Sequence, residues 1–170
     1  MILRLGLLAV LGIGLSAGPT ASAPNPTVAG KANKVILLKS ERRLLLLRGD
    51  TVLGSYRVAL GRDPRGEKTR QGDGRTPEGR YLLDWRNPNS RFYRSIHVSY
   101  PNAADRERAR ARGVAPGGDI MIHGLPNGLE AIGSAHSNWD WTEGCIAVTN
   151  REMDEIWAAV DDGTAIEMRP

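Results

Sequence analysis

The feature that most constrains the fold is a series of short aliphatic runs separated by charged or glycine-containing turns. Residues 35–38 and 44–47 are four-residue runs of this kind, and a third follows at 51–60 after the turn Gly49-Asp50. Runs this short, bounded by charge, are typical of strands and too short for helices. The pattern predicts an antiparallel meander, so we expect a mainly β fold.

The rest of the chain after residue 60 mixes further strands with two helices. Gly61 to Arg80 is the longest irregular stretch, and an irregular segment of this length is usually functional or mobile. We expect strands at 81–85, 96–100, 119–123 and 164–168, a turn at 87–90, and helices at 103–112 and from residue 149 to a stop at Gly163. Thr149 and Glu152 have capping-box spacing, which marks the start of the second helix.

The first 32 residues resemble a targeting segment and a linker. Arg4 gives a positive start, Leu5 to Leu15 is an apolar stretch of 11 residues, and Ala21-Ser-Ala23 is a small-residue cleavage site. About 20 apolar residues are needed to span a bilayer. We therefore predict a signal peptide at 1–23, a linker at 24–32 and one domain at 33–170. The protein is expected to be exported to the periplasm or cell envelope, with no stable membrane span after processing.

Composition argues against a nucleic-acid partner. The formal net charge is +4, but the basic residues are scattered and the chain has only one Phe to interleave with them. Nucleic-acid binding favours a basic stripe with aromatic residues. The surface charge indicates, at most, attraction to an anionic polymer or to a peptide rich in carboxylates.

The single cysteine is the strongest candidate for chemistry. One Cys cannot form an internal disulfide, so Cys145 is a buried filler, a metal ligand or a nucleophile. It follows the polar turn Thr142-Glu-Gly144 and begins an apolar run, which favours an accessible thiol. A nucleophilic Cys needs a base close in space. His123, at the end of the expected strand 119–123, meets that requirement.

A metal site is the weaker alternative. Cys145, His123 and His136 are the residues that would form it, but they lack the paired spacing of zinc ligands. We therefore expect no metal and no cofactor.

The same residues resemble a known family. The stretch "IMIHG" at 120–124, followed by "WTEGCIAVTN" at 141–150, is similar to the YkuD-type L,D-transpeptidase catalytic domain. That domain is marked by His-Gly, a spacer, Ser/Thr-His-Gly-Cys, an apolar residue and then an Asn. The resemblance extends to "GDGRTPEGRY" at 72–81, covers the chain from about residue 33, and is strongest to the YafK-like subgroup of murein transpeptidases and hydrolases. It implies a YkuD-like β-sandwich or mixed-sheet domain with two or three short peripheral helices.

The resemblance also implies roles for residues. Cys145 would be the acyl-accepting nucleophile and His123 its base, with the Gly124 carbonyl orienting the imidazole. The N–H groups of Gly144 and Cys145 would face the oxyanion. Further candidates for substrate binding are Arg75, in the loop expected beside the cleft, and His136, Trp139 and Trp141, in or near the spacer.

Two departures from the signature leave the reaction open. Glu143 stands where the signature has its second His, and the spacer after His123 is longer than the common pattern. We expect an exported cysteine enzyme acting on peptidoglycan stem peptides, an L,D-transpeptidase if an amine accepts the acyl group. If water is the acceptor, the protein is a hydrolase, for example one releasing a wall-linked lipoprotein. A catalytically inert wall-binding module is a third possibility.

Overall fold

A computed structural model describes residues 30–170 of the chain. The signal peptide predicted at 1–23 and most of the linker predicted at 24–32 lie outside the described residues. Within residues 30–170, no helix is long and apolar enough to cross a membrane.

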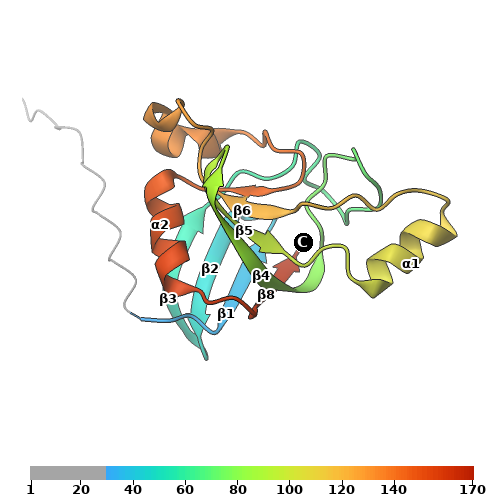
Figure 1. The fold of residues 1–170 in the computed structure, drawn as a ribbon, viewed down its shortest axis with the longest axis horizontal. Helices are drawn as coiled ribbons and strands as arrows, with labels where there is room; N and C mark the ends of the chain where they lie inside the picture. Colours follow the sequence, from blue (N-terminus) through green and yellow to red (C-terminus); the bar gives the residue numbers. More distant parts are fainter. Residues whose placement is uncertain (1–29) are drawn as a thin grey trace, which may run out of the picture.

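The core of the fold is one eight-stranded mixed sheet (Figure 1). Its order is β3-β2-β1-β8-β4-β5-β6-β7, with β1–β8 and β6–β7 parallel and the other pairs antiparallel. The strands are β1 (Lys34–Leu38), β2 (Arg43–Arg48), β3 (Thr51–Arg57), β4 (Gly79–Ser90), β5 (Tyr93–Val98), β6 (Met121–His123), β7 (Ile146–Ala147) and β8 (Thr164–Arg169). The mainly β, mixed-sheet prediction is therefore confirmed.

The sheet curls until its two ends are linked by backbone hydrogen bonds. Beyond β3 the chain crosses to β7, where Ala59 and Ala147 exchange N–H···O bonds of 3.1 and 2.9 Å. Leu60 O accepts from Thr142 N at 3.0 Å. The curl encloses a continuous aliphatic core to which every strand except β3, β6 and β7 contributes two or more buried side chains, such as Leu44 and Leu46 on β2.

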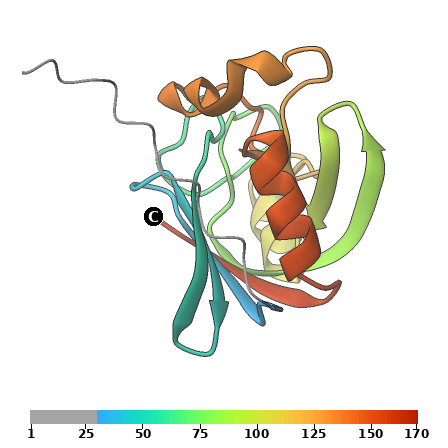
Figure 2. The ribbon, with the colours of Figure 1, turned by 90° about the vertical axis from the view of Figure 1, so that its left-hand side faces the viewer.

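Three helices accompany the sheet. α1 (Ala103–Ala111) and α2 (Asn150–Ala159) both begin with a capping box, formed by Asn102 with Asp105 and by Thr149 with Glu152. α1 extends away from the sheet, whereas α2 lies against β5 and β6 and places Met153 and Ile156 in the core (Figures 1 and 2). The 3-10 segment η1 (Glu130–Asn138) was not predicted and is interrupted at Gly133, where φ is 52°.

The prediction of a turn at 87–90 is wrong. Strand β4 continues through these residues to Ser90, and Asn87 pairs with Ser95 of β5 before the register shifts. Proline lacks an N–H, so Pro88 favours a strand irregularity as well as a turn. The actual turn lies at Arg91 and Phe92, which brings both residues to the cleft described below.

Candidate active site

One cavity of about 600 Å³ lies where β6, β7 and the β4–β5 hairpin meet. Its lining includes both residues of the predicted catalytic pair, Cys145 and His123. The remaining lining residues come from the β4–β5 hairpin, from β6 and the segment before it, from the segment before β7, and from the loop after β3. They are Arg62, Asn87, Asn89, Ser90, Arg91, Phe92, Ser95, Asp119, Met121, Trp141, Thr142 and Glu143.

The register of two parallel strands explains why the pair meets. Ile122 of β6 lies opposite Ile146 of β7, and both side chains are fully buried in the core. Because side chains alternate along a strand, His123 and Cys145 point to the other face, and Cys145 is level with Met121. The thiol and the imidazole therefore lie diagonally on neighbouring strands, above the same cavity.

His123 is buried against two aromatic rings. The centroid of the Phe92 ring is 4.6 Å from that of the imidazole, and the centroid of Trp141 is 5.7 Å away. Nδ1 of His123 donates to the Gly124 carbonyl at 2.7 Å. A carbonyl can only accept, so this bond places the proton on Nδ1 and leaves Nε2 as the basic nitrogen. Burial lowers the pKa of His123 to about 4, against a smaller opposing effect of the Gly124 bond.

Cys145 is a neutral thiol in this geometry. Sγ lies 3.4 Å from the carbonyl oxygen of Asp119, to which the thiol donates. Burial raises the pKa of the Cys145 thiol, while a hydrogen bond from the Met121 backbone N–H acts in the opposite direction. Asp119 has a left-handed backbone (φ 55°), a conformation that Asp tolerates better than most residues. The resting pair is therefore thiol and neutral imidazole.

The turn before Cys145 is held by Thr142. Its hydroxyl donates to Cys145 O at 2.8 Å and accepts from Gly144 N at 3.1 Å. The Gly144 N–H is thus used inside the turn, which differs from the prediction that it faces an oxyanion. Gly144 has φ 130°, and a Cβ there would be 2.6 Å from Arg75 O, so its role is to let two loops approach closely.

Three of the predicted substrate-binding residues do not line this cavity. The Arg75 side chain turns to Asp63, with an Nε–Oδ2 distance of 3.0 Å. Trp139 is 53% exposed and lines a separate surface depression. His136 lies in a second cavity. Trp141 does line this cavity, and spacing along the sequence could not show that it does so while the other three candidates do not.

Four other lining residues could hardly be recognised from the sequence. Arg62 forms an ion pair with Glu143, the residue that replaces the signature histidine. Arg91 and Phe92 reach the cleft because the hairpin turns there, and Asp119 because it lies two residues before the start of β6. The only available signal for Phe92 was that it is the single Phe of the chain.

Metal binding is not indicated by the arrangement of candidate ligands. Among residues 30–170, no group of three or more His, Cys, Asp or Glu side chains is placed to hold a metal ion. His136 and Cys145 line different cavities.

A curled mixed sheet carrying this cysteine–histidine cleft agrees with the family comparison. The family model of the YkuD L,D-transpeptidase catalytic domain matches residues 32–168, and the chain belongs to this family.

Individual relatives agree with this placement. The chain is 33% identical over 158 residues to the Escherichia coli K12 protein named "Putative L,D-transpeptidase YafK", and the match covers 89% of this chain and 56% of YafK. The chain thus spans little more than half the length of this relative.

Solved structures share the fold. The helical cell shape determining protein Pgp2 of Campylobacter jejuni aligns with a TM-score of 0.60 at 24% identity, over 82% of this chain and 48% of that one. The L,D-transpeptidase of Xylanimonas cellulosilytica aligns with a TM-score of 0.53 at 16% identity, over 87% and 65%.

Proposed function

We propose that this protein is an exported cysteine enzyme that cleaves an amide bond in peptidoglycan stem peptides through a thioester on Cys145, and that it is an L,D-transpeptidase. The observation that carries the proposal is the shared position of Cys145 and His123 on one face of β6 and β7, at the wall of one cavity. Family membership and the names of the relatives support the substrate class.

The first step is attack of sulfur on the amide carbonyl of the donor peptide. As the C–S bond forms, the thiol proton passes from Sγ to Nε2 of His123. The thiol must first leave the Asp119 carbonyl, which holds it in the resting state. The Cys145 N–H is the backbone donor we assign to the oxyanion, since Gly144 N is engaged by Thr142.

The second step breaks the C–N bond. His123 returns the proton to the departing amine, and the acyl group remains as a thioester on Cys145. An incoming amine then attacks the thioester and loses a proton to His123, the C–S bond breaks, and His123 returns that proton to the sulfur, which restores the thiol. The bond from Nδ1 to Gly124 O keeps the imidazole oriented for all four proton transfers.

Water is the alternative acceptor. Glu143 lines the cavity and pairs with Arg62, so a carboxylate stands where the signature has an imidazole. A carboxylate can hold a water molecule by hydrogen bonding, which would make the protein a hydrolase of the same bond, acting on stem peptides or on a wall-linked lipoprotein.

The test is a product assay with a defined muropeptide, with and without an added amine acceptor, read by mass spectrometry. We expect a transpeptidation product that requires the amine, and we expect Cys145→Ala and His123→Ala to abolish turnover while circular dichroism shows an intact fold. Hydrolysis products alone would establish the water-dependent reaction. Full turnover by either variant would refute the proposed pair.

A further inference from the structure

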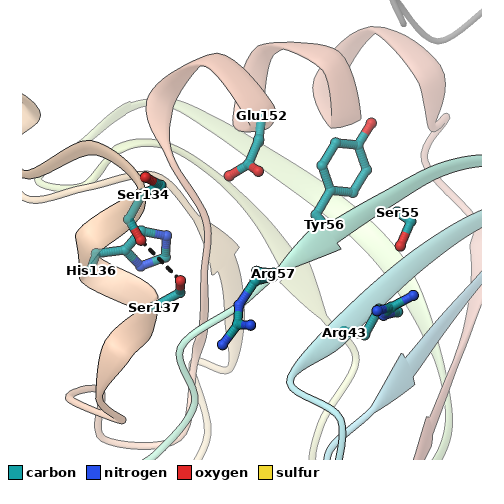
Figure 3. A pocket seen from close by; sticks show the side chains of 8 residues that line it. All are labelled: Arg43, Ser55, Tyr56, Arg57, Ser134, His136, Ser137 and Glu152. Carbon is teal, nitrogen blue, oxygen red and sulfur yellow. Dashed lines mark hydrogen bonds between the residues drawn. The ribbon is translucent and has the colours of Figure 1, made fainter. Parts of the chain in front are cut away.

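A second cavity of about 290 Å³ lies between η1, α2 and the β2–β3 hairpin. It shares no lining residue with the cleft that holds Cys145. Figure 3 shows His136 and Ser134 of η1 facing Arg57 of β3, with Glu152 of α2 beside them. The three elements come from distant parts of the chain, so the cavity is a product of the tertiary fold.

The unusual feature of this cavity is a buried histidine without partners. His136 is 2% exposed, and neither ring nitrogen has a hydrogen-bond partner among residues 30–170. A buried polar group without a partner costs free energy, so it points to a ligand that would supply one. Burial lowers the pKa of His136, so the ring is neutral near pH 7. A neutral imidazole offers one N–H donor and one acceptor nitrogen.

Two arginines stand on the opposite wall. Arg43 of β2 and Arg57 of β3 are directly paired in the antiparallel register, so both side chains are on the same face of the hairpin. In the described part of the chain, the one carboxylate paired with Arg43 is Glu41, at 3.8 Å with both side chains more than half exposed, which is a weak contact. Guanidinium groups arranged together favour a carboxylate or phosphate ligand.

The acidic residue of the cavity does not cancel this charge. Oε2 of Glu152 is engaged in the helix cap, where it accepts from Thr149 N at 2.9 Å and Thr149 Oγ1 at 2.7 Å. The lining of the cavity therefore includes two guanidinium groups and one carboxylate that already has partners. Ser134 and Ser137 add short polar groups beside the imidazole, and the Ser137 hydroxyl donates to Ser134 O at 2.9 Å (Figure 3).

We infer that this cavity binds the carboxylate end of a short peptide, with Arg43 and Arg57 holding the carboxylate and His136 pairing with the last amide group. The amide can pair with one of the two unpartnered ring nitrogens, through its N–H or its C=O. Phosphate oxygens could also bind the arginines and accept from the imidazole N–H, so phosphate is the competing ligand to be tested. This site is separate from the proposed catalytic cleft and does not depend on the activity proposed for it.

The three histidines of the chain make a direct test possible. His136 reports on this cavity, His123 on the cleft, and His97, paired with Asp84, on the outer surface. The sample is the full chain with the Cys145→Ala substitution and ¹³C-labelled histidine. It is titrated with the L,L and D,D forms of N-acetyl-alanyl-alanine. Separate titrations use the C-terminally amidated form of each peptide and inorganic phosphate. Proton–carbon NMR spectra then follow each ring separately.

We expect one or both free-carboxylate peptides to shift the His136 signals in a saturable way while His97 stays unchanged. The amidated peptides should not shift them. Arg43→Gln with Arg57→Gln should weaken binding at least about tenfold, whereas Arg110→Gln on α1, which removes a charge far from the cavity, should not. Unchanged His97 signals in each variant show that the fold is intact.

Several results would overturn the inference. These are the absence of any His136 shift, equal shifts from the amidated peptides, full binding by the double arginine variant, or a response to phosphate alone. A shift of His123 without His136 would support the proposed cleft and refute this second site. A shift of His136 without His123 would support this site whatever the outcome for the cleft.

Discussion

The imidazole of His123 has a proposed chemical role, and its burial lowers the stability of the folded protein at acidic pH. It is 3% exposed and packs against Phe92 and Trp141. Burial holds its pKa at about 4, below the ordinary value of 6.5. The neutral ring needed to accept a thiol proton is thus maintained through the mildly acidic range, although a low pKa also makes it a weak base.

This burial predicts a loss of stability on acidification. Below pH 6.5 the unfolded chain binds a proton at residue 123, whereas the folded protein does not until about pH 4, so the free energy of unfolding falls as pH decreases through that window. The full difference corresponds to about 3 kcal/mol. Urea unfolding at several pH values should show that His123→Asn loses this dependence and that His97→Asn keeps it. An unchanged pH profile in His123→Asn would contradict the assigned burial.

At the residue scale, the sequence was sufficient to select the proposed catalytic pair but not to predict its surroundings. Cys145 and His123 could be selected because the chain has one thiol and few imidazoles. The contacts of the thiol with Asp119 O and Met121 N depend on strand register, which is fixed by pairing between residues distant in sequence. The direction of the Arg75 side chain depends on where Asp63 folds, and residue type alone does not indicate it.

At the element scale, the end of β6 is held by close packing around Gly124. A Cβ at this position would be 2.6 Å from Asn150 Oδ1 and 2.9 Å from Tyr93 Cβ. The same Asn150 oxygen accepts from Leu125 N at 2.8 Å, so it ties the start of α2 to the residue following Gly124. The strand end that carries His123 is therefore positioned by β5 and α2 together.

We predict that Gly124→Ala destabilises the fold by about 1–3 kcal/mol, because overpacking forces Asn150 or Tyr93 to move. Urea unfolding measures this difference. Gly118→Ala is the matched control: its added Cβ would meet only Pro101 Cδ, at 4.0 Å, and should change stability little. Equal stability of Gly124→Ala and the wild type would show that the packing at this strand end is loose.

Element prediction succeeded where local signals were consistent. The strands at 35–38 and 44–47 and the capping box of α2 agree with the structure. It failed at Asn87-Pro-Asn-Ser90, because local turn propensity was overruled by pairing with β5. η1 was missed because it is a 3-10 segment interrupted at Gly133, with no regular apolar period.

At the scale of the whole molecule, curling of the sheet creates both cavities. The link between Ala59 and Ala147 brings the residues that follow β3 against the segment before the thiol. Asp140 fixes this segment further, since its carboxylate accepts from Arg42 Nε at 3.0 Å and from Leu60 N at 2.9 Å. The order of an eight-stranded sheet with two parallel pairs rests on contacts between distant residues, and the family resemblance was the only sequence-level indication of it.

The measurement that tests the central claim most directly is the intact mass of the protein after rapid acid quenching during reaction with a muropeptide donor. We predict a mass increase equal to the donor acyl group, located on Cys145 by peptide mapping. Hydroxylamine, which cleaves thioesters, should remove it, and His123→Asn should form it far more slowly. Product formation at the normal rate by Cys145→Ala, with no acyl group on the protein, would contradict the account.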